Sequence, residues 1–179
     1  MTQQQDTRTI IIGAGMAGIL AAIKLLEQGK TNFCVYEKAD RIGGTWRDNT
    51  YPGLTCDVPS HSYTYSFEPN PNWTRTMPPG AEIQAYFENV VEKYGLAPYL
   101  RFGEEVTRLD FIDGRWQLQT ISGRRDEADF VVAATGGANS WHECTRSVLD
   151  ERPEPGAYSP PTFAASSVHT RPHLRVSHE

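Results

Sequence analysis

The feature of this sequence with the clearest chemical use is a glycine-rich stretch near its start. Three glycines there follow the spacing G-x-G-x-x-G. In such a turn, the first glycine permits a tight corner, the second lets the backbone approach a pyrophosphate, and the third lets a helix pack against a strand. The stretch reads Gly13, Ala14, Gly15, Met16, Ala17 and Gly18. It predicts that backbone amides at a helix start bind the diphosphate of a dinucleotide.

An acidic residue follows at the distance that dinucleotide binding requires. Glu37 lies 19 residues after Gly18, close to the ~20-residue spacing at which a carboxylate hydrogen-bonds a ribose diol. A carboxylate at this place repels a 2′-phosphate, so FAD or NAD is expected as the first nucleotide rather than NADP. The alternative is an ordinary glycine-rich turn followed by a solvated glutamate, and the neighbouring elements argue against it.

Those elements form a strand, a helix and a second strand. Residues 9–12 are a β-branched run typical of a buried strand, and residues 16–27 carry apolar side chains at helical spacing. Gly29 is expected to cap that helix. Residues 32–37 read as the second strand. This order predicts a parallel βαβ unit.

The rest of the chain predicts an α/β domain followed by a tail. A long Gly- and Pro-rich connection, residues 41–80, is expected to be functional, and a helix is expected over residues 80–94. The fold class is therefore α/β and Rossmann-like, with a parallel central sheet and a small antiparallel β meander, over residues 1–137. Residues 138–179 read as an irregular, poorly ordered tail with four of the five His and no Lys. The remaining strands are expected at residues 100–106, 109–112, 116–121 and, as a final buried strand, 129–134.

Composition excludes several classes of protein. The net charge of −5 gives no reason to expect nucleic-acid or anionic-lipid binding. The longest apolar stretch, residues 10–26, is interrupted by three glycines and Lys24, so no membrane span is expected. The three cysteines form no disulfide framework and no metal pattern, and no secretory leader precedes the first strand. These features fit a reducing cytoplasm and no metal site.

The stretch after Glu37 carries a family resemblance. Residues 37–46 read EKADRIGGTW, residues 51–63 read YPGLTCDVPSHSY, and residues 134–136 read ATG. In this order, across residues 8–137, the sequence resembles the Baeyer–Villiger and flavin-containing monooxygenases. The resemblance implies an FAD-binding domain and an enzyme that also uses NADPH, with O₂ and a small-molecule substrate as its other reactants.

The resemblance also implies roles for individual residues. The three glycines of the motif would hold the FAD pyrophosphate, and Glu37, with Lys38 beside it, the adenosine ribose. The backbone of Val106 would meet the adenine. Gly44, Thr45 and Trp46 would line the path from the ribose toward the flavin ring. Asp57 and Tyr63 would lie beside the flavin, and Thr55, Cys56 and Asp57 would face the nicotinamide. The further candidates for cofactor binding are Ala134, Thr135 and Gly136. Asp57 is the candidate nearest the flavin, but we assign no catalytic residue.

In the complete family, such an enzyme inserts oxygen into a ketone or adds it to a soft nitrogen or sulfur. This sequence has no second G-x-G-x-x-G. The family also carries the fingerprint Phe-x-Gly-x-x-x-His-x-x-x-Trp-Pro, which the tail matches only at Phe163 and His169, with Ala165 where glycine is expected. We therefore expect a truncated chain, with frame disturbances near residue 137 and after Thr170. Such a chain would supply FAD binding without turnover.

Two alternatives stay open at this point. The chain would be a non-catalytic FAD-binding fragment or a pseudogene product if the truncation removed all activity. The second alternative is a different flavoprotein with two dinucleotide sites, such as a disulfide reductase or an amine oxidase. A disulfide reductase needs a redox cysteine pair soon after the acid, whereas Cys56 is single. The Tyr-Pro-Gly stretch argues against an amine oxidase.

Overall fold

The computed structural model describes residues 7–136, and all structural statements below refer to that part of the chain. The predicted tail, with its partial match to the family fingerprint, lies outside the described residues. Within them, no helix is long and apolar enough to cross a bilayer.

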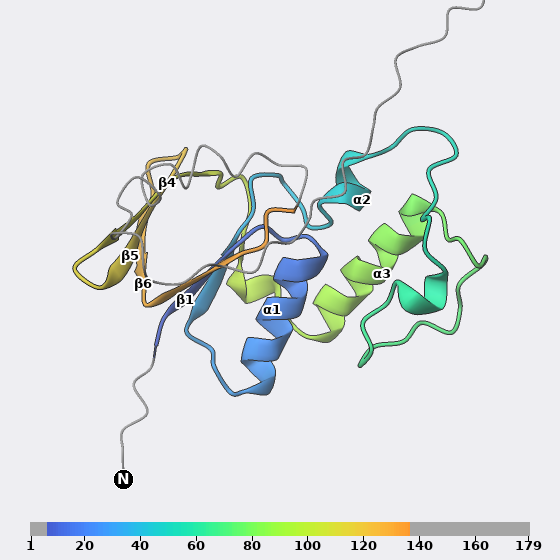
Figure 1. Ribbon diagram of the computed structural model, residues 1–179, viewed down its shortest axis with the longest axis horizontal. Helices are drawn as coiled ribbons and strands as arrows, with labels where there is room; N and C mark the ends of the chain where they lie inside the picture. The colour runs from blue at the N-terminus through green and yellow to red at the C-terminus, as the bar shows by residue number, and fades with distance from the viewer. Residues whose placement is uncertain (1–6, 137–179) are drawn as a thin grey trace, which may run out of the picture.

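A four-stranded parallel sheet forms the centre of the domain (Figure 1). Its order is β3-β2-β1-β7, from strands β1 (Thr9–Ile12), β2 (Phe33–Tyr36), β3 (Leu100–Arg101) and β7 (Phe130–Ala133). Strand β1 pairs with β2 on one side and with β7 on the other. The carboxyl ends of β1, β2 and β7 therefore meet at one edge, which is where open α/β sheets bind ligands.

Two helices cover one face of this sheet. Helix α1 (Met16–Glu27) connects β1 to β2, and helix α3 (Gly80–Lys93) packs beside it. Ile11, Phe33 and Val35 point into the core that these helices share with the sheet. Because successive strand residues face opposite sides, the intervening residues must pack on another layer.

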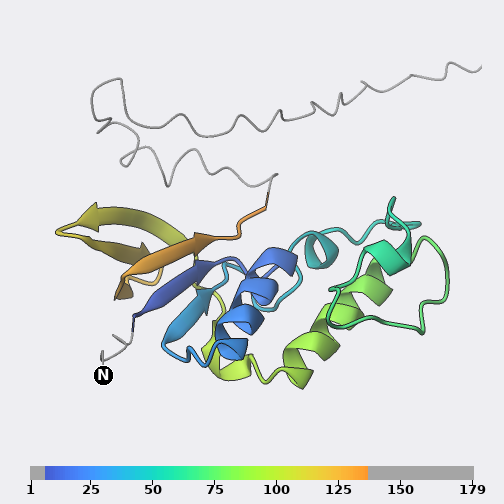
Figure 2. The same ribbon diagram turned by 60° about the horizontal axis from the view of Figure 1, so that its bottom comes forward.

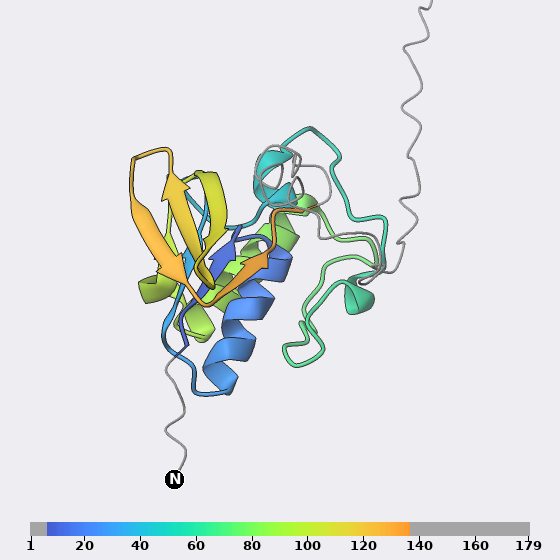
Figure 3. The ribbon, with the colours of Figure 1, turned by 60° about the vertical axis from the view of Figure 1, so that its left-hand side comes forward.

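That layer is an antiparallel sheet of strands β4 (Val106–Ile112), β5 (Arg115–Thr120) and β6 (Arg125–Ala128). Ile10, Cys34 and Tyr36 bury their side chains against its Leu109 and Leu118. Figures 2 and 3 show the meander on the side of the parallel sheet opposite α1. The result is a three-layer arrangement of helices, parallel sheet and antiparallel sheet.

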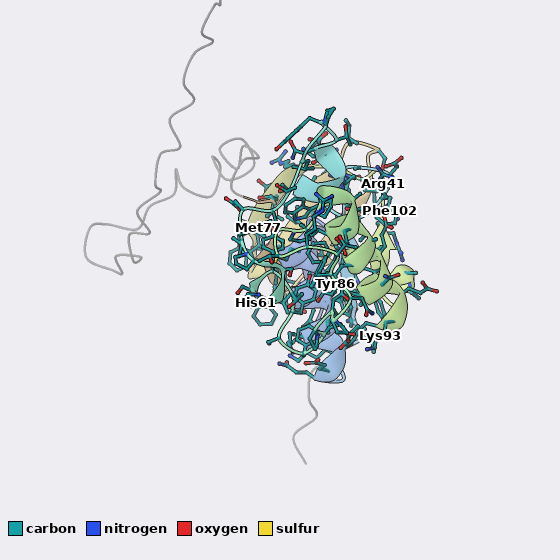
Figure 4. The ribbon with its side chains drawn as sticks, turned by 90° about the vertical axis from the view of Figure 1, so that its right-hand side faces the viewer. Arg41, His61, Met77, Tyr86, Lys93 and Phe102 are labelled. Carbon is teal, nitrogen blue, oxygen red and sulfur yellow. The ribbon has the colours of Figure 1, made fainter. Side chains whose placement is uncertain are left out.

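The long connection before α3 folds onto that helix. It contains a short helix α2 (Thr45–Asp48) and a 3₁₀ turn η1 (Ser60–Ser62). The hydroxyl of Tyr86 on α3 accepts the Tyr65 N–H at 2.9 Å and donates to the Glu68 carbonyl at 2.7 Å. Figure 4 labels Tyr86 on α3, with His61 and Met77 on this connection. A second 3₁₀ turn, η2 (Ala97–Tyr99), leads from α3 into β3.

Most of the predicted elements are present, but four predictions about strands need correction. The second strand spans only Phe33–Tyr36 and is shorter than the predicted 32–37. The single strand predicted at residues 100–106 is divided between the end strand β3 and the start of β4. Only Leu100–Arg101 joins the parallel sheet, because Gly103, with φ +66°, turns the chain into β4. Strand β6 is absent from the prediction. The final strand, β7, is not buried, since Phe130 is 56% exposed.

Candidate dinucleotide site

The glycine-rich corner has the geometry that its sequence predicts. Gly13 leaves β1 with φ +101°, and a Cβ atom there would lie 2.5 Å from the Ala134 carbonyl oxygen. A Cβ atom on Gly18 would lie 1.9 Å from the Gly13 carbonyl oxygen. Both contacts are with backbone, which cannot give way, so only glycine fits at these two positions. The corner therefore holds the start of α1 close to the ends of β1 and β7.

The first turn of α1 offers unsatisfied amides at this corner. Its N-cap residue is Gly15, which has no side chain to accept a hydrogen bond, and no acidic residue lies in the first turn. The first N–H groups of a helix have no intrahelical partner and form the positive end of the helix dipole. A Cβ atom on Gly15 would meet only Gly44 Cα, at 3.7 Å. The space in front of these amides can therefore admit an anion.

The Glu37 carboxylate is held against the same corner. Its Oε2 accepts the Ala14 N–H at 2.8 Å, and its Oε1 accepts the Ala39 N–H at 3.0 Å. The Gly43 N–H donates in turn to the Ala14 carbonyl at 3.0 Å. Ala14 thus connects the carboxylate at the end of β2 to the Gly43-Gly44 turn.

A buried arginine forms an ion pair with this carboxylate. Nη1 of Arg47, whose side chain is 6% exposed, lies 3.0 Å from Glu37 Oε1. Its Nε and Nη2 donate to the two oxygens of Asp48 at 2.7 and 3.1 Å. Burial disfavours the charged guanidinium, but the hydrogen bond to Asp48 and the attraction of Glu37 leave the pKa of Arg47 raised. The carboxylate and the guanidinium therefore form an ion pair in the wall of the site.

These groups border a cavity of about 470 Å³ at the carboxyl edge of the parallel sheet. Fourteen of the residues predicted to bind the cofactor line it, and they come from six separate stretches of the chain. They are Gly13, Gly15, Met16, Ala17, Glu37, Lys38, Gly44, Thr45, Trp46, Tyr63, Val106, Ala134, Thr135 and Gly136. The predicted residues are thus brought together over much of the proposed ligand path.

Aromatic and acidic groups complete the wall. Trp46 Nε1 donates to the Tyr63 hydroxyl at 3.1 Å, and the two rings meet edge to face. Burial raises the pKa of Tyr63. On another side of the cavity, the Glu104 carboxylate accepts from Thr120 Oγ1, Ser122 Oγ and Arg124 Nε. These three hydrogen bonds lower the pKa of Glu104 to about 2. Glu104 thereby ties the start of β4 to the β5–β6 turn.

Five predicted residues do not line the cavity. Ala14 and Gly18 lie behind its wall, where they form the corner itself. Cys56 is buried, with its N–H bonded to the Pro78 carbonyl, and Thr55 forms a bridge with Pro79. Asp57 is exposed. The structure therefore brings 13–17 and 44–46 together but leaves 55–57 apart from them.

Other lining residues were not predicted. They are Ile12, Tyr36, Gly43, Arg47, Glu104, Glu105, Leu109 and Ala133. Ile12, Tyr36 and Ala133 end their strands, so the strand assignments could have supplied them. For Arg47 and Glu104, no spacing in the sequence signals that the side chains turn inward.

Elsewhere in residues 7–136, a second cavity of about 330 Å³ lies over the antiparallel sheet. It is lined by Arg108, Asp110, Ile112, Gln117, Leu118, Gln119, Arg125, Asp126 and Glu127, and includes no predicted site residue. No group of three or more His, Cys, Asp or Glu in the described part of the chain could hold a metal ion.

The parallel sheet, the glycine corner and the acid at the end of β2 define a Rossmann-like dinucleotide-binding domain. In agreement, a family model described as NAD(P)-binding Rossmann-like domain matches residues 11–77. The chain is similar in sequence to Baeyer–Villiger monooxygenases. It is 48% identical to one from Streptomyces coelicolor, over 74% of this chain and 26% of that protein.

Two further comparisons agree with this assignment. An FAD-binding monooxygenase of Aspergillus terreus is 39% identical over 75% of this chain and 25% of its own length. Among solved structures, an oxidised steroid monooxygenase bound to NADP superposes with a TM-score of 0.69 at 36% identity, covering 75% of this chain and 27% of that one. The chain thus spans about a quarter of the length of the relatives that it matches.

Proposed function

We propose that this chain binds FAD and is the FAD-binding portion of an NADPH-dependent flavoprotein monooxygenase. The observation that carries the proposal is the Glu37 carboxylate, hydrogen-bonded to Ala14 N–H at the glycine corner and bordering the cavity. Amides for a diphosphate and an acid for a ribose therefore border one space. The relative from Aspergillus terreus, described as FAD-binding, supports FAD as the dinucleotide.

The residues of this chain would act by binding and orienting the cofactor. The amides at the start of α1 would hold the diphosphate, and Glu37 would accept hydrogen bonds from the adenosine ribose. Val106 and Glu104 would border the adenine, while Trp46 and Tyr63 would border the path toward the flavin. The bound flavin would supply the redox and oxygen chemistry.

For the whole protein we propose oxygenation of a small-molecule ketone, or of a soft nitrogen or sulfur, with NADPH as reductant. The Baeyer–Villiger relatives support the ketone reaction in particular. Thr55, Cys56 and Asp57 would meet the nicotinamide only if other parts of the protein carry the NADP toward them, because they do not line the FAD cavity.

Equilibrium binding of FAD to the purified chain tests this proposal. Trp46 lines the cavity, so added FAD should quench tryptophan fluorescence. Glu37→Gln should weaken FAD by roughly 1.5–3 kcal/mol, since hydrogen bonds to a charged acceptor contribute about that much. The matched control is Glu92→Gln, an exposed position on α3. Equal affinity of the wild type and both variants would overturn the role of Glu37, and absence of FAD binding would overturn the function.

A further inference from the structure

Protein groups already occupy three of the acceptor positions of the Glu37 carboxylate. A carboxylate offers about four acceptor positions, two on each oxygen. On Oε1 the Ala39 N–H and the Arg47 guanidinium are both in place, at 3.0 Å each. On Oε2 the Ala14 N–H occupies one position at 2.8 Å. Across residues 7–136, the second position of Oε2 has no protein donor, so it is the acceptor left for a ligand hydroxyl.

Arg47 also connects this carboxylate to the loop that contains Arg41. Its Nη1 donates to the Arg41 carbonyl at 2.7 Å, while Asp48 binds the other edge of the guanidinium in a fork. The planar guanidinium can hold all of these acceptors at once, which a lysine ammonium cannot do in the same geometry. The loop from Arg41 to the Gly43-Gly44 turn is therefore joined to Glu37 through one side chain.

The ion pair is too buried to be explained as a surface contact. The side chains of Arg47 and Glu37 are 6% and 5% exposed. A buried ion pair is weak evidence of a contribution to stability, because desolvation offsets the attraction between the charges. It does fix the orientation of both groups. Here the group being oriented is the acid that borders the cavity.

We propose that Arg47 is a positioning residue for the adenosine ribose, acting through Glu37. By holding Oε1, it prevents rotation of the carboxylate and presents the remaining acceptor position of Oε2 to the ribose hydroxyls. This inference rests on the proposed FAD binding and deepens it. No step of the chemistry passes through Arg47, and its effect is on FAD affinity alone.

A double-mutant cycle on the full chain tests this role. The dissociation constant for FAD would be measured by fluorescence titration for the wild type, Arg47→Met, Glu37→Gln and the double variant. Arg47→Met should weaken FAD by about tenfold, the factor expected of one charge-assisted hydrogen bond. In the Glu37→Gln background the same change should alter affinity by less than about twofold, because the residue through which it acts is already disabled.

Two further variants complete the design. Arg75→Met, at an exposed position, should leave FAD affinity unchanged. Arg47→Lys keeps a cation beside Glu37 and should lose less affinity than Arg47→Met. If Arg47→Met fails to fold, as judged by circular dichroism, Arg47→Lys in the two backgrounds replaces it in the cycle.

The outcomes separate the two proposals. Wild-type chain that binds no FAD overturns the proposed function and this inference together. If the wild type binds FAD and the Arg47 variants match Arg75→Met, only the positioning role is overturned. An equal loss in the presence and absence of Glu37 would show a general structural role and would also overturn it.

Discussion

The peptide N–H of Ala14 lies 2.8 Å from Oε2 of Glu37, although 23 residues separate them in the sequence. The bond joins the glycine corner after β1 to the end of β2. The amides proposed to bind the diphosphate and the acid proposed to bind the ribose are therefore held as one unit before any ligand arrives, a form of preorganisation that lowers the cost of binding.

Two glycines of the corner should respond differently to alanine. A methyl group on Gly18 would lie 1.9 Å from the Gly13 carbonyl oxygen, whereas one on Gly15 would meet nothing closer than 3.7 Å. Gly18→Ala should therefore lower the free energy of unfolding by about 1–3 kcal/mol. Urea unfolding measures this change.

Gly15→Ala should leave the unfolding free energy within about 0.5 kcal/mol of the wild type, as for a substitution with free space. It should nevertheless weaken FAD by at least about tenfold, or ~1.4 kcal/mol, because the methyl group takes space that the diphosphate needs. The assignment of the two glycines would be wrong if Gly15→Ala unfolded the protein and left FAD affinity intact.

The free energy of unfolding should depend on pH through Asp126, which lies at the junction of the parallel and antiparallel sheets. This carboxylate accepts from Arg8 Nε at 3.0 Å and from the Tyr36 hydroxyl at 2.8 Å. Burial alone would raise the pKa of Asp126, but the hydrogen bonds from Arg8 and Tyr36 hold it below the usual value of 3.8. The unfolded chain then binds more protons than the folded chain as pH falls below about 4.

The stability that Asp126 contributes is therefore present above the unfolded pKa and is lost as pH falls through the lower folded value. Asp126→Asn should cost about 2 kcal/mol at pH 7, as loss of hydrogen bonds to a charged group does. The cost should shrink at pH 3. Urea unfolding at both pH values provides the test, with the exposed Glu127→Gln as control. A cost that is the same at both values would contradict the account.

Glu104 should titrate far below an ordinary glutamate. Hydrogen bonds from Ser122, Thr120 and Arg124 lower its pKa to about 2, so the stability it contributes is present above the usual pKa of 4.5 and is lost as pH falls toward 2. An NMR titration of the side-chain carboxyl carbon measures the midpoint. Ser122→Ala should raise that midpoint, and an unchanged midpoint would show that the hydrogen bonds are not its cause.

The sequence predicted those parts of the site that depend on local spacing. The glycines fix the corner through backbone contacts, and Glu37 follows from the length of one βαβ unit, so both were accessible from the pattern. Arg47 was not, because its inward direction depends on the path through Gly43 and Gly44, with φ +125° and +54°. Nothing in the local sequence TWRDN distinguishes it from a solvated arginine.

In the fold, too, some parts follow from local sequence and others are decided by pairing with distant residues. Asp113 and Gly114, both at positive φ, make the two-residue turn between β4 and β5, and the sequence places a turn there. Strand β6 consists of Arg125–Ala128, three of whose four residues are charged, so pairing with β5 decides its conformation rather than propensity. The apolar residues of β7 suggested burial, but described residues cover only one of its edges.

FAD binding in the cavity at the glycine corner is tested most directly by a map of backbone amide shifts in the ¹⁵N-labelled chain as FAD is added. Residues 13–18, 37–39 and 43–46 should shift, together with Val106, because they line the cavity, form the glycine corner beside it or, in the case of Ala39, hydrogen-bond to Glu37. Shifts confined to the cavity over the antiparallel sheet, around Arg108 and Asp126, would contradict it, as would an unchanged spectrum.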